Sequence, residues 1–270
     1  MKDLTDLTEL LNEILEVKLG TDEKYIVAQG IGRKLMLHSN SINILLENSI
    51  DISSCITLTR TALETYAVFN LLYLNGTEEE KQLRFDLWKI DALKTRQKYS
   101  VSVEVFDPQE RKQMVEQLED EEKQIAELKD KIRSSNYYKN FPNGYNNLMI
   151  KNAVWKFNIE KIAGYNKTTK IDMGIKTMVE KCGIKEIYLQ DIYSFTSMHA
   201  HTNFISIMQG KQMDRENFEI SKRHLGILNS ILITYFINSF IKLYDLSIKN
   251  YCEKNHIFYT FERRIMGNNI

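Results

Sequence analysis

The sequence is poor in the residues that break or cross-link regular structure. Its 270 residues include 11 glycines and 2 prolines, roughly half and a sixth of average usage. The 3 cysteines are odd in number and form no Cys-x-x-Cys motif, which argues against a disulfide framework and a zinc knuckle. The 36 basic and 36 acidic side chains balance, so no net charge draws the chain to nucleic acid or membrane. So few breakers favour long helices.

Apolar residues recur at three-to-four spacing along most of the chain, which is the helical period. This spacing predicts helices over residues 4–15, 23–48, 53–74, 78–105, 108–133, 171–181, 185–209 and 214–254. A loop is expected at 134–146, with an irregular stretch after it up to residue 170. We therefore expect one all-α domain over residues 1–270, folded as a multi-helix bundle.

Residues 77–133 are expected to form a projecting helical hairpin. Thr77 precedes three glutamates, which suits a helix N-cap, and Asp107 followed by Pro108 is a cap with a first-turn proline. The second helix of the pair has a narrow apolar stripe in a charged background, a pattern typical of paired helices. The hairpin is either an arm that docks a protein partner or a solvated structural element.

The segment 225–243 is nearly apolar and about long enough to cross a bilayer. It contains polar residues that would be costly in lipid, and a buried bundle helix shows the same composition. We favour the buried helix and expect no membrane association. The N-terminus carries acids where a secretory signal carries bases, so with the cysteine usage we expect a cytoplasmic protein.

The region 131–185 is locally basic, with 11 Lys or Arg against 3 Asp or Glu. Basic residues with interleaved aromatics can hold phosphates and stack bases, although a solvated surface with scattered lysines shows the same composition. If the region binds RNA, the candidate residues are Tyr137, Tyr138, Lys139, Tyr145 and Lys151.

Arg60 and Glu64 are the only charges between Asp51 and Glu78. Four residues apart, they share one helix face with apolar neighbours. A buried charge is very expensive without a partner, so the two are expected to pair. The pair either fixes the register of a buried helix or forms the floor of a pocket where the guanidinium binds an anion such as phosphate.

A second candidate stretch contains Tyr193, Ser197, His199 and His201. His199 lies where an apolar helical stripe turns polar, so it is either a satisfied core histidine or a general acid or base. His201 points to nearly the opposite helix face. The two imidazoles therefore do not easily hold one metal ion, and we expect no metal site.

Two of these patterns occur together in a known group of proteins. Arg-x-x-x-Glu (Arg60, Glu64), followed much later by Tyr-x-x-x-Ser-x-His (Tyr193, Ser197, His199), resembles an uncharacterised family of bacterial all-helical proteins. That family looks distantly similar to the HEPN superfamily of toxin and phage-defence proteins. The resemblance implies a metal-independent endoribonuclease without a cofactor, working as a homodimer. HEPN proteins that are active carry Arg-x(4–6)-His, a spacing found here at Arg33 and His38.

RNA cleavage without a metal needs a base, an acid and a cation for the phosphorane. With Ser197 in the same motif, His199 and His201 are the candidates for proton transfer, Arg60 for the cation and Glu64 for its orientation. The expected function is a defence or toxin-type effector acting on RNA. The alternative is a non-catalytic helical sensor or scaffold that binds a protein or nucleotide ligand.

Overall fold

The computed structural model describes residues 2–17, 20–48, 51–99, 107–140, 153–157, 172–182, 193–197 and 215–246. In these ranges the regular structure is helical, apart from one isolated antiparallel bridge between Phe157 and Asp172. The all-α prediction is confirmed. The chain falls into two compact units, one made of Met1–Tyr73 with Ile175–Ile270 and the other of Leu74–Gly174.

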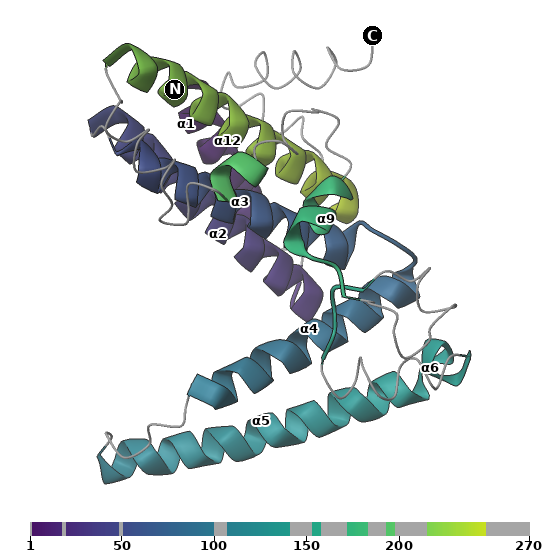
Figure 1. Ribbon diagram of the computed structural model, residues 1–270. Coiled ribbons are helices and arrows are strands. Elements are labelled where there is room, and N and C mark those ends of the chain that lie inside the picture. The colour runs from purple at the N-terminus through teal and green to yellow at the C-terminus, as the bar shows by residue number, and fades with distance from the viewer. Residues whose placement is uncertain are drawn as a thin grey trace. The chain divides into compact units, whose positions relative to one another are not determined.

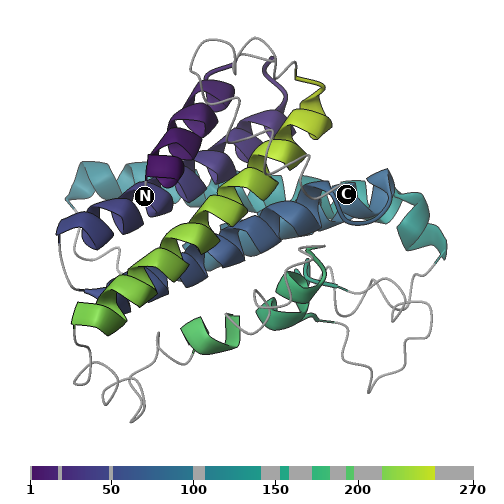
Figure 2. The same cartoon turned by 90° about the horizontal axis from the view of Figure 1, so that it is seen from above.

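The first unit is a bundle of four long helices. These are α1 (Lys2–Leu15), α2 (Glu23–Asn48), α3 (Ile52–Tyr73) and α12 (Arg215–Tyr244). Although α12 is remote in sequence, it runs along the other three helices and packs against each of them (Figures 1 and 2). The buried residues of α2 recur every three or four positions, as at Ala28, Gly32 and Leu35. They form one face of the helix, and this face packs against the neighbouring helices.

Aromatic side chains fill the centre of this bundle. The rings of Phe69 on α3 and Phe236 on α12 have centroids 4.6 Å apart, and Phe240 lies 5.7 Å beyond Phe236. All three side chains are completely buried. A Cβ at Gly32 would sit 2.8 Å from both Leu15 and Phe236, so the missing side chain is what lets α2 approach its neighbours.

Helix α12 includes the apolar segment 225–243, whose composition suits either a buried bundle helix or a membrane span. By length and composition alone, Phe218–Tyr244 could cross a membrane. Its polar groups, however, have protein partners: Asn229 donates to the Thr59 hydroxyl at 2.9 Å and to the Leu225 carbonyl at 2.8 Å. Packing against three helices, together with this buried link to α3, supports the interpretation of α12 as a core helix.

The short helix α9 (Ile175–Glu180) packs against α3 in the same unit. Its inward residues are Met178 and Val179, and just beyond it the carbonyl of Cys182 accepts a hydrogen bond of 3.2 Å from the Asn70 amide. The helix predicted over 171–181 is thus shorter than expected, because residues 172–174 are not helical and Asp172 instead bridges to Phe157.

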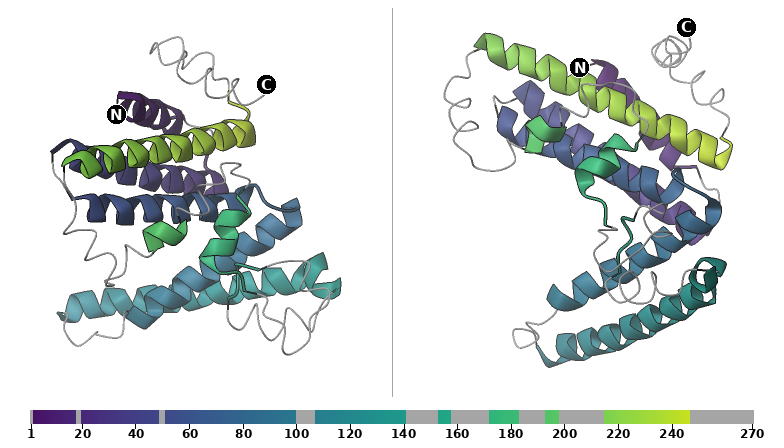
Figure 3. Two further views of the ribbon diagram at one scale, coloured as in Figure 1. Left: turned by 45° about the horizontal axis from the view of Figure 1, so that its top comes forward. Right: turned by 45° about the vertical axis from the view of Figure 1, so that its right-hand side comes forward.

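The second unit contains α4 (Glu78–Tyr99), α5 (Pro108–Ser134) and α6 (Asn136–Asn140). Helices α4 and α5 lie side by side (Figures 1 and 3). Both predicted caps are present. Asp107 accepts hydrogen bonds from the Gln109 and Glu110 amides in a capping box, and the Thr77 amide donates to Glu80 at 2.9 Å.

Ion pairs fix the antiparallel register of α4 and α5. Asp86 on α4 pairs with Lys131 on α5 at 3.0 Å. Further along α4, Arg96 pairs with the buried Glu121, which comes earlier in α5 than Lys131 does. Near these links, Ile125, Leu128 and Ile132 are buried. The second half of the narrow stripe predicted from the sequence is therefore the contact face of a helix pair, whereas Val115 in its first half is exposed.

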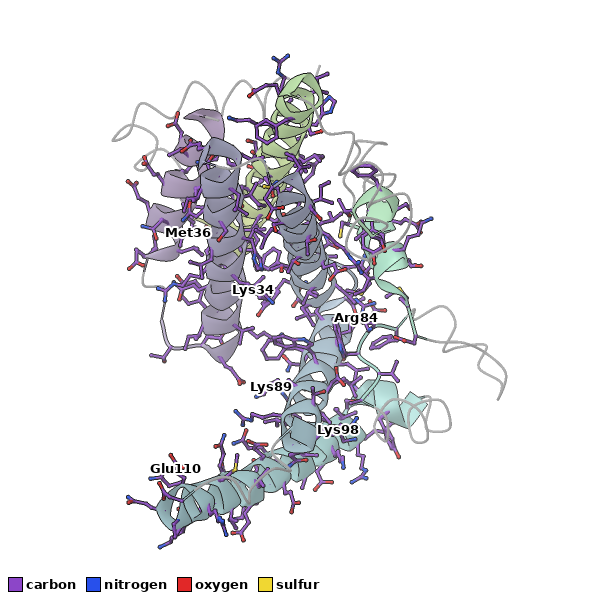
Figure 4. The ribbon with its side chains drawn as sticks, turned by 60° about the vertical axis from the view of Figure 1, so that its left-hand side comes forward. Lys34, Met36, Arg84, Lys89, Lys98 and Glu110 are labelled. Carbon is purple, nitrogen blue, oxygen red and sulfur yellow. The ribbon has the colours of Figure 1, made fainter. Side chains whose placement is uncertain are left out.

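Arg84 is a buried cation of this unit. Its guanidinium carbon lies 4.9 Å from the centroid of the Phe157 ring, and Nη1 donates to the Asn75 carbonyl before α4 begins. Figure 4 shows Arg84 on α4, with Lys89 and Lys98 further along the same helix and Glu110 in the first turn of α5. Nearby, the Trp155 indole donates to Asp91 at 3.1 Å, which ties residues 153–157 to α4.

The loop predicted over 134–146 is wrong at its start. Residues Asn136–Asn140 form α6, because Ser135 acts as a cap whose hydroxyl accepts from the Tyr138 amide at 3.3 Å. In the predicted helix 185–209, the structure describes only residues 193–197, and these are helical. The predicted ends at residues 105 and 254 lie outside the described residues.

The two described cysteines carry a testable consequence of this packing. Cys55 and Cys182 are buried free thiols. Burial, and then the charge of Asp51, raises the pKa of Cys55 to about 11, and burial raises the pKa of Cys182 to about 12. Because the thiolate is the reactive form, we expect iodoacetamide at pH 8 to label neither residue in the folded protein and both in urea. Peptide mass spectrometry would show this, and labelling of either residue without urea would contradict it.

Candidate functional site

Helix α3 positions the Arg60–Glu64 pair. It begins behind Asp51, whose carboxylate accepts hydrogen bonds from both the hydroxyl and the amide of Ser54. These bonds from Ser54 lower the pKa of Asp51, so the cap is ionised at neutral pH. The helix then buries most of its surface, with Ile56 and Ala67 in the core.

Arg60 and Glu64 pair as the sequence predicts. Arg60 Nε donates to Glu64 Oε1 at 2.8 Å along one helix face. The side chains are 20% and 30% exposed, so the pair lies at the edge of the core. The residues around the pair on α3 are mixed, since Ile56 and Ala67 are buried whereas Thr57 is exposed, so the two charges reach solvent at the margin of the apolar face.

Tyr193 covers the guanidinium from a distant part of the chain. Its ring centroid lies 5.6 Å from Arg60 Cζ, within the range of a cation–π contact. Burial alone lowers the pKa of Arg60, but the hydrogen bond and the charge of Glu64, aided by Tyr193, outweigh burial and raise it. The site therefore holds a permanently charged guanidinium, which the ring of Tyr193 and the carboxylate of Glu64 both contact.

The structure places part of the second sequence pattern beside this pair. Residues 193–197 form one helical turn, in which the buried Thr196 hydroxyl donates to the Tyr193 carbonyl at 3.2 Å. Ser197 is half-buried and lies four residues after Tyr193, on the same helix face. His199 and His201 lie outside the described residues, so their predicted roles stay predictions.

The predicted RNA-binding residues belong to the second unit where they are described. Lys139 is exposed and Tyr138 half-buried on α6, and only the backbone of Tyr137 is described. Tyr145 and Lys151 lie outside the described residues. The structure therefore puts one exposed cation and one accessible ring on the same short helix.

The Arg33–His38 spacing does not form a site on α2. Arg33 pairs with Glu16 at 3.4 Å on the surface. His38, five residues later, points in a different direction around the helix. Burial, and then the charge of Lys34, lowers the pKa of His38, which keeps this imidazole neutral at pH 7.

A cavity of about 280 Å³ lies in the second unit, where sequence reasoning placed nothing. Its lining comes from α4, the end of α5 and the start of α6: Glu79, Gln82, Leu83, Asp86, Lys131, Ile132, Ser134, Ser135 and Asn136. The one sequence signal that could have indicated this cavity is Asp86, a carboxylate between the apolar residues Phe85 and Leu87. Its cationic partner is 45 residues away, a distance that helical periodicity does not bridge.

Metal ligands do not gather in the part of the chain that the structure describes, where no three His, Cys, Asp or Glu side chains come together. The described site is built on a guanidinium, a carboxylate and a phenol ring. Such a set recognises an anion through hydrogen bonds and charge.

These features define an all-helical protein with an arginine–glutamate pair at the edge of its bundle. A comparison with protein families matches residues 25–220 to a family of unknown function, DUF5677. The chain belongs to this family. Neither the curated proteins nor the solved structures include a significant match. The predicted uncharacterised helical family is thus found, whereas the resemblance to HEPN proteins stays a prediction.

Proposed function

We propose that the protein is an effector of the toxin or defence type that acts on RNA and holds an RNA phosphate at Arg60. One observation supports this most: the Arg60–Glu64 pair is accessible to solvent and carries an aromatic ring on its guanidinium. Glu64 takes the Nε donor, so the terminal nitrogens of the guanidinium are left to other partners, of which Tyr193 is one.

Arginine suits this role because its planar fork can donate two parallel hydrogen bonds to phosphate. Glu64 holds the fork in one orientation, so less rotamer freedom is lost when the anion binds. Tyr193 provides a surface against which a nucleotide can rest beside the bound phosphate. These three groups are what supports the proposed binding of an RNA strand.

Catalysis adds a requirement for proton transfer. If the effector cleaves RNA, we propose that His199 or His201 takes the proton of the 2′-hydroxyl and returns one to the leaving oxygen. Arg60 then stabilises the negative charge of the phosphorane. Ser197 lies two residues before His199, and its hydroxyl can hold a non-bridging phosphate oxygen. In keeping with the HEPN resemblance, we propose a cytoplasmic homodimer.

The competing function is a sensor or scaffold without catalysis. One observation favours it: both partners of the pair come from a single helix, four residues apart, where such pairs also occur as ordinary helix stabilisers. In that case removing Arg60 costs stability and leaves RNA binding unchanged, so the same variant decides between the two functions.

Arg60→Gln is expected to weaken binding of single-stranded RNA at least tenfold, because a charge-assisted contact to phosphate is lost. Since the pair is partly exposed, unfolding should become easier by only about 1 kcal/mol. Fluorescence anisotropy with a labelled RNA measures the first quantity and urea denaturation the second. Arg60→Lys should retain part of the binding, because it keeps the charge and loses the fork.

Arg33→Gln is the matched control, since Arg33 forms a surface ion pair in the same unit. This variant should bind RNA like the parent. Equal RNA binding by the parent and by Arg60→Gln would reject the proposal and favour the scaffold. His199→Ala would then separate binding from cleavage: an effector that cuts RNA should keep its affinity and lose cleavage.

A further inference from the structure

The cavity between α4, α5 and α6 is built around a buried carboxylate. The Asp86 side chain is 5% exposed. Gln82 Nε2 donates to its Oδ1 at 2.9 Å, and Lys131 Nζ lies 3.0 Å from the same oxygen. Among the described residues, Oδ2 accepts no hydrogen bond. Since Asp86 lines the cavity, this second oxygen is an acceptor available to a ligand.

The rest of the lining limits what such a ligand can be. Leu83 and Ile132 are buried and provide apolar walls, which suits a flat ring. A cationic ligand would meet the ammonium of Lys131, and an anionic group in the cavity would meet Asp86 and Glu79. A neutral ligand that donates to a carboxylate and accepts from an ammonium at adjacent positions meets neither penalty.

We propose that this cavity binds a guanine base. The Watson–Crick edge of guanine presents the donors N1–H and N2–H₂ next to the acceptor O6. Because Oδ1 of Asp86 is taken by Gln82 and Lys131, both donors would converge on Oδ2, whose two lone pairs can accept them, with O6 toward the Lys131 ammonium. Adenine and the pyrimidines do not offer two neighbouring donors followed by an acceptor. The volume of about 280 Å³ lies at the small end of ligand sites and suits one base.

The base can come from a free guanine nucleotide or from an unpaired guanine of an RNA. Proteins read single-stranded RNA by taking unstacked bases into such pockets and bonding their Watson–Crick edges. Helix α6 contributes Asn136 to the lining and carries the half-buried Tyr138 and the exposed Lys139 two and three positions later, so a ring and a cation lie on the same short helix. The guanine site itself is independent of the role proposed for Arg60.

Calorimetric titration of the full chain with GMP, IMP and AMP tests the site. GMP should bind, IMP at least tenfold more weakly because it lacks the 2-amino group, and AMP more weakly still. Asp86→Asn should lower the affinity for GMP at least tenfold. Asp130→Asn is the matched control on α5, since Asp130 is an exposed carboxylate outside the lining, and it should bind GMP like the parent.

Asp86→Asn can also disturb the link to Lys131, so a second variant keeps the test independent of folding. Asn136→Trp places a bulky group at the exposed rim without touching Asp86, and it should block GMP. Equal affinity for AMP and GMP, GMP binding that survives both variants, or no binding of any nucleotide would overturn the proposal.

The source of the base is decided by two short single-stranded RNAs that differ by one guanine. Tighter binding of the guanine-containing RNA, with the difference lost in Asp86→Asn, identifies RNA as the source. Equal binding of both RNAs alongside tight binding of GMP identifies a free nucleotide. Because Arg60→Gln leaves GMP binding intact under this proposal, failure of the RNA-directed function and failure of the guanine site are distinguishable.

Discussion

Phe236→Ala should lower the free energy of unfolding by about 3–5 kcal/mol, the usual cost of removing a buried phenyl ring. Phe236 is completely buried on α12 and contacts rings on both sides, at Phe69 and Phe240. Its ring also lies over Gly32, where α2 comes closest. The surrounding helices are held by their other contacts, so the space cannot fully close. Urea denaturation followed by circular dichroism measures the change.

Ile227→Ala is the control on the same helix, since Ile227 is 47% exposed. It should change stability by less than about 1 kcal/mol. Similar losses for the two variants would show that α12 does not pack into the bundle as described. This result would also reopen the membrane interpretation of the helix.

Gly76→Ala should destabilise the second unit by about 2–4 kcal/mol. Gly76 has a φ of +96°, a conformation that costs an L-residue about 1–3 kcal/mol. A Cβ there would also lie 2.0 Å from Glu80 Oε2. That oxygen accepts the Thr77 amide at 2.9 Å in the cap of α4, so Glu80 cannot move aside without breaking the cap. The thermal midpoint measures the loss.

Gly30→Ala is expected to have the opposite effect, an increase in stability. Gly30 lies in the middle of α2, and nothing lies within 4 Å of a Cβ placed there. Alanine should therefore stabilise the helix by about 0.5–1 kcal/mol. A loss of stability at both glycines would mean that the exposed face of α2 is covered, and no loss at Gly76 would show that the cap of α4 can rearrange.

Helix starts could be predicted from the sequence because a cap is a local interaction. Asp107 followed by Pro108, and Thr77 followed by glutamates, each signal a first turn within four residues, and both turns are present. Helix α6 could not be predicted in the same way. Its aromatic and asparagine-rich sequence favours a loop, and its one local signal is a single serine, Ser135, whose hydroxyl accepts from the Tyr138 amide and is a weaker sign than an aspartate followed by proline.

The candidate site shows the same division. The Arg60–Glu64 pair follows from four-residue spacing on one helix, so the sequence predicted its partners and left open whether they are sealed in the core or reach solvent. The contact of Tyr193 with Arg60 joins segments far apart in the chain, and so does that of Lys131 with Asp86. Periodicity identifies which side of a helix is apolar, whereas it does not identify the helix that will face it.

The order of the elements along the chain has a consequence for synthesis. The Thr59 hydroxyl on α3 accepts its hydrogen bond from Asn229 on α12, which is synthesised 170 residues later. At the usual rate of roughly 5–20 residues per second, a ribosome needs about 10–30 s to make that stretch. The segment 74–174 is complete well before then. The apolar face of α3 therefore spends many seconds without its partner helix, an interval in which nascent chains depend on chaperones to avoid aggregation.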